Sequence, residues 1–221
     1  MIQTTSMTAK NTRSPCSRTA ALVAVALGLI CGTARGEVAR DFDSCKAHPR
    51  DRRIRLVTDL GPIDIDLYGV RAPISVCNFL RYVEAGLFSA GRFYRTVRPD
   101  NQATVPVKIS VIQADIRADA VAFPPIPLES TVKTRIRHLD GTISMARDAP
   151  ETASSSFFIT IGDQPALDFG GARNPDGQGF AAFGRVIHGM AVVRRIWMSH
   201  AVGEDLTPPR AIKRAYVLES R

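Results

Sequence analysis

The sequence lacks the patterns that mark several common classes of enzyme and repeat protein. Its four histidines are His48, His138, His188 and His200. None of them has the paired spacing of a metal site, so we read them as surface or structural residues and expect no metal and no cofactor. Ser144 is not set in a glycine-flanked nucleophile turn, which argues against a serine hydrolase. The chain also has no internal repeat, no linker and no low-complexity tract.

An apolar run long enough to cross a bilayer comfortably is missing too. The run at residues 20–30 is shorter than the roughly 20 residues of a membrane span. Basic residues precede it, and the small residues of Ala34-Arg35-Gly36 follow it. This order predicts a secretory signal peptide, residues 1–36, that is cleaved after Gly36. We therefore expect a periplasmic or secreted protein without stable membrane insertion. The alternative is an uncleaved N-terminal anchor.

Little charge and few cysteines remain once this segment is removed. The formal net charge falls from +8 to +4, because residues 1–36 hold four basic residues and no acid. No dense run of Lys and Arg with interleaved aromatic residues is present, so we expect no nucleic-acid partner. Cys45 and Cys77 are the cysteines left. In an oxidising compartment such a pair is a disulfide candidate; the alternative is a buried Cys77 thiol and a free Cys45.

Short strand-like segments recur along the rest of the chain. Residues 53–58 and 63–68 alternate apolar and polar side chains around a turn, which predicts a β-hairpin. Further strands are expected at residues 93–97, 107–113, 142–146, 157–161, 183–186 and 211–219. Residues 98–102 and 170–179 are rich in Gly, Pro, Asn and Asp, which predicts two surface loops.

Helical periodicity is confined to two segments. One begins at Pro73 and stops near Gly86, and the other covers residues 190–198. Many short strands, with helices only towards the two ends, predict a mainly β domain whose sheet closes on itself. We assign this domain to residues 53–221, after a polar lead-in at residues 37–52.

Two strand segments combine apolar residues with a single polar one: Phe93-Tyr94-Arg95 and Val111-Ile112-Gln113. If each strand alternates regularly, Phe93 and Arg95 share one face, and so do Val111 and Gln113. An arginine and an amide supply a fixed charge and hydrogen bonds without an acid–base partner. Such a pair suits a reaction in which a bond rotates and nothing is hydrolysed. On spacing alone, however, a lone arginine on a strand is more often a solvated surface residue.

Five segments in a fixed order decide between these readings: residues 93–95, 111–113, 141–147, 155–160 and 182–190. The series resembles the cyclophilin-type peptidyl-prolyl cis–trans isomerases, especially their bacterial exported branch, and it covers Ile54 to Glu219. The resemblance implies a closed eight-stranded antiparallel β-barrel capped by two α-helices, in agreement with the elements expected above.

The same resemblance implies a function and a kind of partner. The protein would accelerate rotation of X-Pro bonds during the folding of exported proteins, with proline-containing polypeptides as substrates. We expect it to act as a monomer. The alternative is a low-turnover peptide-binding chaperone or assembly factor that uses the same groove.

The resemblance also implies roles for single residues. Arg95 matches the catalytic arginine, and Gln113 matches the glutamine beside it. The substrate-binding positions would be Phe93, Val111, Ala146, Arg147, Ser156, Phe158, Leu167 and Phe180. Among these, the backbone of Ala146 would hold the substrate main chain, whereas Phe158 and Leu167 would wall the proline pocket.

Several positions depart from the family pattern. Ser110 replaces a pocket phenylalanine, and Ala114-Asp115 replaces a double glycine. Arg147 and Ser156 stand where asparagine and glutamine are common. Ala166 lies where cyclosporin-sensitive members have tryptophan, so we expect weak binding of cyclosporin. The segment between the first two motifs is longer than usual. The reaction type is therefore better defined than the catalytic efficiency.

Overall fold

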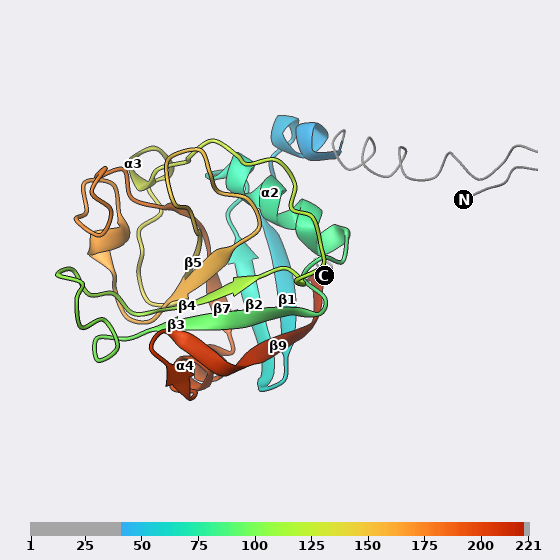
Figure 1. Cartoon of the computed structure of the whole chain (residues 1–221). Helices are drawn as coiled ribbons and strands as arrows, with labels where there is room; N and C mark the ends of the chain where they lie inside the picture. Colours follow the sequence, from blue (N-terminus) through green and yellow to red (C-terminus); the bar gives the residue numbers. More distant parts are fainter. Residues whose placement is uncertain (1–40, 219–221) are drawn as a thin grey trace, which may run out of the picture.

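The computed structural model describes residues 41–218 and consists mainly of a closed β-barrel (Figure 1). Eight strands pair antiparallel in the order β1-β2-β7-β5-β6-β4-β3-β9, and β9 returns to β1. Their bounds are β1 (Arg52–Thr58), β2 (Gly61–Leu67), β3 (Gly91–Val97), β4 (Val111–Asp115), β5 (Thr142–Met145), β6 (Phe157–Thr160), β7 (Ala181–His188) and β9 (Asp205–Leu218). The short strand β8 (Ala201–Val202) pairs with β9. The predicted barrel is thus confirmed, whereas the predicted signal peptide lies outside the described residues.

The β1–β2 hairpin shows how alternation builds the barrel wall. The inward side chains of Ile54 and Leu56 in β1 are fully buried, and Arg53 and Arg55 point outward between them. Arg53 lies opposite Asp66 and Arg55 opposite Asp64, with Nε-to-Oδ1 distances of 2.6 Å in both pairs. The hydrogen bonds from Arg55 lower the pKa of Asp64, although burial acts in the opposite direction. The hairpin therefore buries one face and neutralises the charges on the other.

Helices α2 (Pro73–Glu84) and α4 (Met190–Trp197) cover opposite sides of the barrel (Figure 1). Proline occupies the first turn of α2, where its missing N–H costs nothing. Gly86 follows the helix with a φ of +67°, a left-handed conformation that suits glycine. On α4, Val193 and Ile196 are fully buried against the barrel. Both predicted helices are confirmed.

Besides the short 3-10 helix η1 (Pro165–Leu167), two α-helical segments were not expected from the sequence. One is the short α3 (Thr131–Thr134), and the other covers residues 41–47, within the predicted polar lead-in. Cys45 of this second segment forms a disulfide with Cys77 of α2, with a Cα–Cα distance of 5.8 Å. The disulfide fastens the segment to α2. No helix within residues 41–218 is both long enough and apolar enough for a membrane span.

Two strand boundaries differ from those predicted by more than two residues. The strand expected from residue 107 begins only at Val111, because the preceding backbone bonds to side chains instead. The N–H and carbonyl of Ile109 pair with the Gln102 amide at 3.2 and 2.7 Å. The N–H of Ser110 donates to the Gln164 side chain at 3.2 Å. The last strand begins earlier than predicted, at Asp205, because its first residues pair with β8 and β3.

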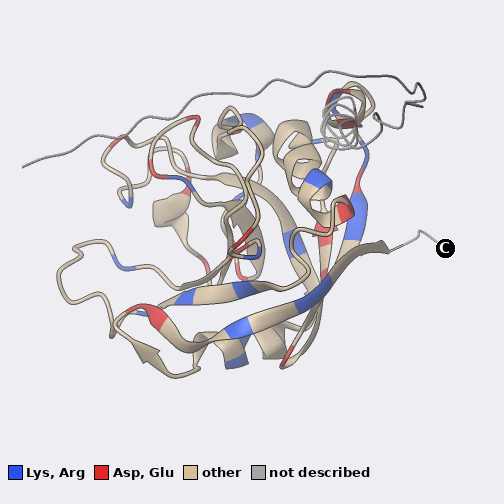
Figure 2. Cartoon of the chain, turned by 45° about the vertical axis from the view of Figure 1, so that its right-hand side comes forward, with Lys and Arg blue, Asp and Glu red and all other residues tan. Residues whose placement is uncertain are grey.

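Charged residues are distributed over the whole described chain. Figure 2 shows Lys and Arg on strands, helices and loops alike, with Asp and Glu among them. Within residues 41–218, no group of three or more His, Cys, Asp or Glu side chains is arranged so that it could hold a metal ion.

Candidate active site

Strand β3 carries a bulge that brings two consecutive side chains, Tyr94 and Arg95, to one cavity. Its register with β4 shifts between Phe93, which lies opposite Ala114, and Arg95, which lies opposite Gln113. The pairing with β9 shifts at the same place. A bulge inserts one unpaired residue and re-aims the side chains that follow it. The expected alternation of Phe93 and Arg95 on one face is therefore wrong.

Phe93 itself lies in the barrel core. Its side chain is fully buried and packs edge-on against Phe157, with ring centroids 6.0 Å apart. It does not line the cavity beside Arg95. The predicted substrate-binding role of Phe93 is corrected to a core role, because the bulge turns its side chain inward.

The cavity has a volume of about 400 Å³, within the usual range for ligand sites. Its lining includes the site residues expected from the sequence apart from Phe93: Arg95, Val111, Gln113, Ala146, Arg147, Ser156, Phe158, Leu167 and Phe180. It also includes residues that the sequence did not single out: Tyr94, Ile109, Asp115, Asp148, Thr152, Ser154, Arg173 and Asn174. Ser110 and Ala166, two of the departures from the family pattern, do not line the cavity. Ile109 supplies apolar surface next to Ser110 instead.

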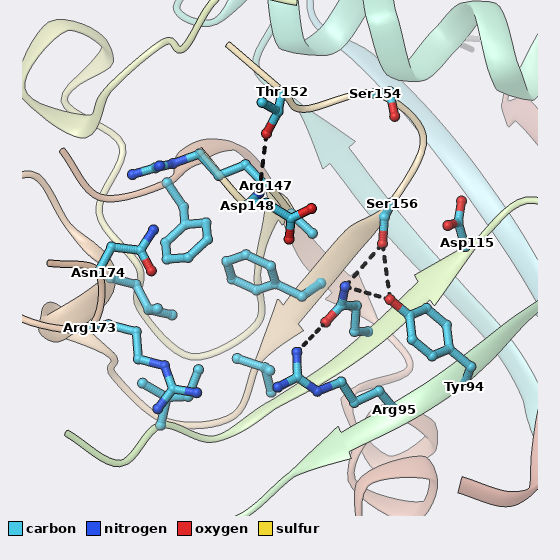
Figure 3. Close-up of a pocket in the computed structure, with 17 residues that line it drawn as sticks. Tyr94, Arg95, Asp115, Arg147, Asp148, Thr152, Ser154, Ser156, Arg173 and Asn174 are labelled. Carbon is cyan, nitrogen blue, oxygen red and sulfur yellow. Dashed lines mark hydrogen bonds between the residues drawn. The ribbon is translucent and has the colours of Figure 1, made fainter. Parts of the chain in front are cut away.

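Arg95 and Gln113 belong to one hydrogen-bonded chain of side chains (Figure 3). Nη1 of Arg95 donates to Oε1 of Gln113 at 3.0 Å. Nε2 of Gln113 donates to the Tyr94 hydroxyl at 2.6 Å and to Oγ of Ser156 at 3.1 Å. Burial, above all, raises the pKa of Tyr94, so its hydroxyl stays protonated. Because both ends of its amide are engaged, Gln113 orients Arg95.

A carboxylate that the sequence did not indicate meets another edge of the Arg95 guanidinium. Glu204 lies between β8 and β9, and its Oε2 accepts hydrogen bonds from Nε of Arg95 at 2.8 Å and from Nη2. The side chain of Arg95 is 35% exposed and that of Glu204 is 24% exposed. The guanidinium therefore stays accessible to a ligand while its orientation is fixed.

An apolar cluster, separate from the barrel core, forms another part of the wall. Its buried members are Val97, Ile109, Val111, Phe158, Leu167 and Phe180. The rings of Phe158 and Phe180 meet edge to face, with centroids 5.3 Å apart and planes at 89°. Ala146 packs against the same cluster, and its N–H donates to the Ser156 carbonyl at 2.9 Å. These residues can hold a small apolar ring next to the charged group.

A buried histidine packs against the ring of Phe158. His138 stacks on it with centroids 5.9 Å apart and planes at 17°. Its Nδ1 lies 2.7 Å from Oδ1 of Asp168, and its Nε2 lies 3.0 Å from Oγ of Ser144. Burial acts to raise the pKa of Asp168, but the hydrogen bonds from His138 outweigh it and lower the pKa. His138 is a satisfied structural residue that supports the apolar wall.

Arg147 is bound by the protein itself. Its side chain is only 1% exposed, and it donates to both carboxylate oxygens of Asp176 at 2.7 and 2.9 Å. Its Nε donates to the Gly179 carbonyl at 2.8 Å, and the guanidinium lies 5.2 Å from the centre of the Phe180 ring. The hydrogen bonds from Arg147 lower the pKa of Asp176 to about 2. The Arg147 side chain therefore supports the loop that carries Phe180, and the binding of substrate at this position stays a prediction.

The two loops predicted from their turn residues meet beside the cavity. Nη1 of Arg173 donates to Oε1 of Gln102 at 3.0 Å and to the Val107 carbonyl at 2.7 Å. Gln102 is 2% exposed, so this part of the expected surface loop is in fact buried. Burial and the charge of Arg95 lower the pKa of Arg173, whereas Glu204 acts in the opposite direction. The segment before Val111 is therefore part of the site.

Tyr94 and Glu204 were missed in the sequence because both reach the site through contacts between segments that are distant along the chain. Tyr94 reaches the cavity only because of the bulge, which depends on pairing with two neighbouring strands. Glu204 stands 109 positions from Arg95 in the sequence. The available signal for Glu204 was an acidic residue after Gly203 in a turn, a pattern too common to single out a site.

Comparisons with known proteins agree with this architecture. Residues 53–217 match the model of the family described as cyclophilin type peptidyl-prolyl cis-trans isomerase/CLD. The chain is 33% identical over 156 residues to peptidyl-prolyl cis-trans isomerase A of Dickeya dadantii, covering 70% of this chain and 76% of that protein. It is 32% identical over 144 residues to a peptidyl-prolyl cis-trans isomerase of Acinetobacter baylyi, covering 65% of this chain and 70% of that protein.

Solved structures show the same fold at low sequence identity. A cyclophilin type peptidyl-prolyl cis-trans isomerase of Cryptosporidium parvum superposes with a TM-score of 0.59 at 17% identity, over 78% of this chain and 100% of that chain. Its structure in the presence of the dipeptide ala-pro gives a TM-score of 0.58 at 18% identity, over 76% of this chain and 100% of that chain.

Proposed function

The chain belongs to the cyclophilin-type peptidyl-prolyl cis–trans isomerases, and from that premise we propose that Arg95 is its catalytic cation. The protein is an isomerase of X-Pro peptide bonds. The observation that carries the assignment to Arg95 is its hydrogen bond to Gln113 at the edge of a cavity with an apolar wall.

Rotation about an X-Pro bond needs little chemistry beyond positioning and electrostatics. Amide resonance sets a barrier of about 20 kcal/mol, and uncatalysed exchange takes tens to hundreds of seconds. No bond is broken, so no nucleophile takes part. In the twisted transition state the imide nitrogen loses conjugation and gains a lone pair. A hydrogen-bond donor aimed at the prolyl nitrogen or carbonyl oxygen therefore favours the transition state over the planar ground state.

Arg95 suits this role because an arginine carries its charge throughout the physiological pH range and presents five N–H donors. Gln113 and Glu204 together accept three hydrogen bonds from it. Further N–H groups of the guanidinium remain for a substrate. Gln113 is proposed to act chiefly by orienting Arg95, since its own amide is already engaged.

The proline ring is proposed to bind in the apolar cluster, against Val111, Phe158 and Leu167. Contact with the ring would hold one side of the X-Pro bond while the other side rotates. Main-chain groups at Ala146 are proposed to hold the substrate backbone. A proline-containing peptide as the ligand class is supported by the Cryptosporidium parvum relative that was solved in the presence of ala-pro.

The proposal extends to the exported branch of the family and to exported proteins as clients. Its support is the signal-peptide pattern of residues 1–36 and the disulfide between Cys45 and Cys77, since disulfides persist mainly in oxidising compartments. Expression of the full chain in a bacterium tests this part. The expected result is a periplasmic or secreted protein whose intact mass corresponds to a first residue at Glu37. A full-length protein confined to the cytoplasm would contradict it.

The catalytic assignment is tested with Arg95→Ala in a cis–trans exchange assay on an Ala-Pro-containing peptide. We expect the rate to fall by about 10²–10³-fold, the usual cost of removing one preorganised donor from a transition state. The melting temperature should stay near that of the wild type, because the Arg95 side chain is outside the core. Arg92→Ala is the matched control, since Arg92 is an exposed arginine of the same strand that does not line the cavity.

Two other outcomes would contradict different parts of the proposal. Full exchange activity of Arg95→Ala would remove Arg95 from the mechanism and leave the family assignment intact. A wild type that binds the peptide but does not accelerate exchange would favour the low-turnover chaperone.

A further inference from the structure

Glu204 accepts two hydrogen bonds along one edge of the Arg95 guanidinium, and we infer that it is a positioning residue for the isomerisation. The inference rests on the proposed catalytic role of Arg95. A single carboxylate oxygen, Oε2 of Glu204, accepts from both Nε at 2.8 Å and Nη2 of Arg95. No residue of the five family-like segments makes this contact, because Glu204 lies beyond all of them in the sequence.

Because the guanidinium is rigid and planar, this contact restricts the direction in which its other N–H groups point. Its five N–H groups lie in one plane. Glu204 takes the Nε–H and one Nη2–H, which share an edge, and Gln113 takes one Nη1–H at 3.0 Å. One N–H of Nη1 and one of Nη2 are left. With two parts of the plane anchored, the direction in which these remaining donors point is fixed.

Without Glu204, Arg95 would be held by Gln113 alone. A long side chain that is partly exposed samples many rotamers, and ordering it costs about 1.5–2 kcal/mol. Arg173 lines the same cavity and adds a second positive charge. The two guanidinium groups repel each other, as the lowered pKa of Arg173 indicates after the larger effect of burial. The two hydrogen bonds that Glu204 accepts hold Arg95 in place against this repulsion.

The carboxylate is itself well anchored. The backbone carbonyl of Glu204 accepts a hydrogen bond from the N–H of Thr96 at 2.8 Å. The side-chain amide of Asn101 donates to the Gly203 carbonyl at 2.9 Å. The turn before β9 is thus hydrogen-bonded both to β3 and to the loop that follows β3. A positioning group on such a fixed support can hold its partner within the narrow geometry that catalysis requires.

Three substitutions at residue 204 separate geometry from charge. Glu204→Gln keeps the length and one oxygen that can accept both hydrogen bonds, but it removes the charge. Glu204→Asp keeps the charge, but it withdraws the oxygen by one C–C bond, about 1.5 Å. Glu204→Ala removes both. If Glu204 acts by position, Gln should rescue the activity and Asp should not.

The measurement is kcat and KM for cis–trans exchange of an Ala-Pro-containing peptide. We expect Glu204→Ala and Glu204→Asp to lower kcat by about 10–100-fold, the range associated with small misplacement of a reacting group, with KM within about twofold. Glu204→Gln should stay within about threefold of the wild type, since a neutral acceptor is weaker than a charged one. Asp205→Asn is the matched control, because it removes a neighbouring exposed carboxylate.

A double-mutant cycle with Arg95→Ala identifies the partner of Glu204. In the Arg95→Ala background, Glu204→Ala should cost no further activity, because the group that it positions is already gone. Melting temperatures of all variants show whether folding is retained, and the Gln variant carries the test if the Ala variant does not fold.

Either of two results with the single variants would overturn the inference: wild-type kcat in Glu204→Ala, or rescue by Asp together with loss in Gln. An additional loss in the Arg95→Ala background would overturn it as well. Failure of the proposed function would look different, since Arg95→Ala would then keep full activity by itself.

Discussion

The side chains on the charged side of the cavity and those on its apolar side are fixed in place by different interactions. On the charged side, Arg95 and Glu204 keep part of their side chains in water and are oriented by hydrogen bonds. On the apolar side, Phe158 is 4% exposed and Leu167 is fully buried, and packing holds them. A charge that must meet a ligand avoids most of its desolvation cost by staying near water. An apolar wall, in contrast, is stabilised when it is removed from water.

Polar residues also support the apolar side, and acidic partners within the protein hold them. His138 packs on Phe158 and is bound by Asp168, and Arg147 packs on Phe180 and is bound by Asp176. The comparison teaches that polar residues near the cavity fall into two groups. Some, such as Arg95, keep part of the side chain exposed, and others, such as Arg147, are buried and fully engaged by partners within the protein.

The largest effect is expected when the apolar side is emptied. Phe158→Ala should lower the free energy of unfolding by about 3–5 kcal/mol, the usual cost of truncating a buried phenylalanine. It should also raise KM more than it lowers kcat, because the wall of the proposed proline pocket is lost. Urea denaturation and exchange kinetics measure the two effects. Phe169→Ala, at a residue that is 53% exposed, should change stability by less than about 0.5 kcal/mol. Equal stability of both variants would break the comparison.

A smaller effect is expected from removing the support of Phe158. His138→Ala leaves the buried Ser144 hydroxyl without its partner and Asp168 with only the backbone N–H of residue 138, which should cost about 1–3 kcal/mol of unfolding free energy. KM should rise, because Phe158 loses the ring stacked on it, whereas kcat should change little. His200→Ala, at an exposed histidine, is the control for loss of an imidazole. A lowered kcat with unchanged KM would instead assign His138 to the charged side.

The Arg147–Asp176 pair should make the apolar side sensitive to acid. The folded-state pKa of Asp176 is lowered to about 2, so its contribution is fully present above the ordinary aspartate pKa of about 4. The contribution is lost as the pH falls from there through 2. Peptide affinity measured by calorimetry should therefore weaken over this range in the wild type. Asp176→Asn should bind severalfold more weakly at pH 7 and change less with acid. Identical pH profiles for the two proteins would contradict a supporting role for this pair.

The smallest effect is expected at the outer end of the charged side. Tyr94→Phe removes one acceptor from Gln113, which retains Ser156 as a partner. A single hydrogen bond contributes about 0.5–1.5 kcal/mol net, so kcat should fall by about 2–10-fold. KM and the melting temperature should stay near the wild-type values. Tyr68→Phe, outside the cavity lining, is the control. A change in KM alone would show that Tyr94 contacts the substrate and does not orient Gln113.

Much of the fold could be predicted because it depends on neighbours along the chain. Alternation in β1 and β2, the proline at the start of α2 and the glycine after it are all local features. The bulge at Tyr94 could not be predicted, because β3 must satisfy the registers of β4 and β9 together. That one residue moved Phe93 from the expected site into the core. Strand β4 likewise begins late because the side chain of Gln102, several residues earlier, competes for its backbone.

The sequence by itself determined the class of fold, the family and about half of the cavity lining, since side-chain periodicity and the order of the motifs are local features of the chain. Only the tertiary structure decided what each polar residue does. Arg95, Arg147 and His138 find their acidic partners 109, 29 and 30 positions away. Closure of the barrel and the packing of its loops set those pairings. The energy of a hydrogen bond depends on distance in space, so no local pattern of residues could specify them.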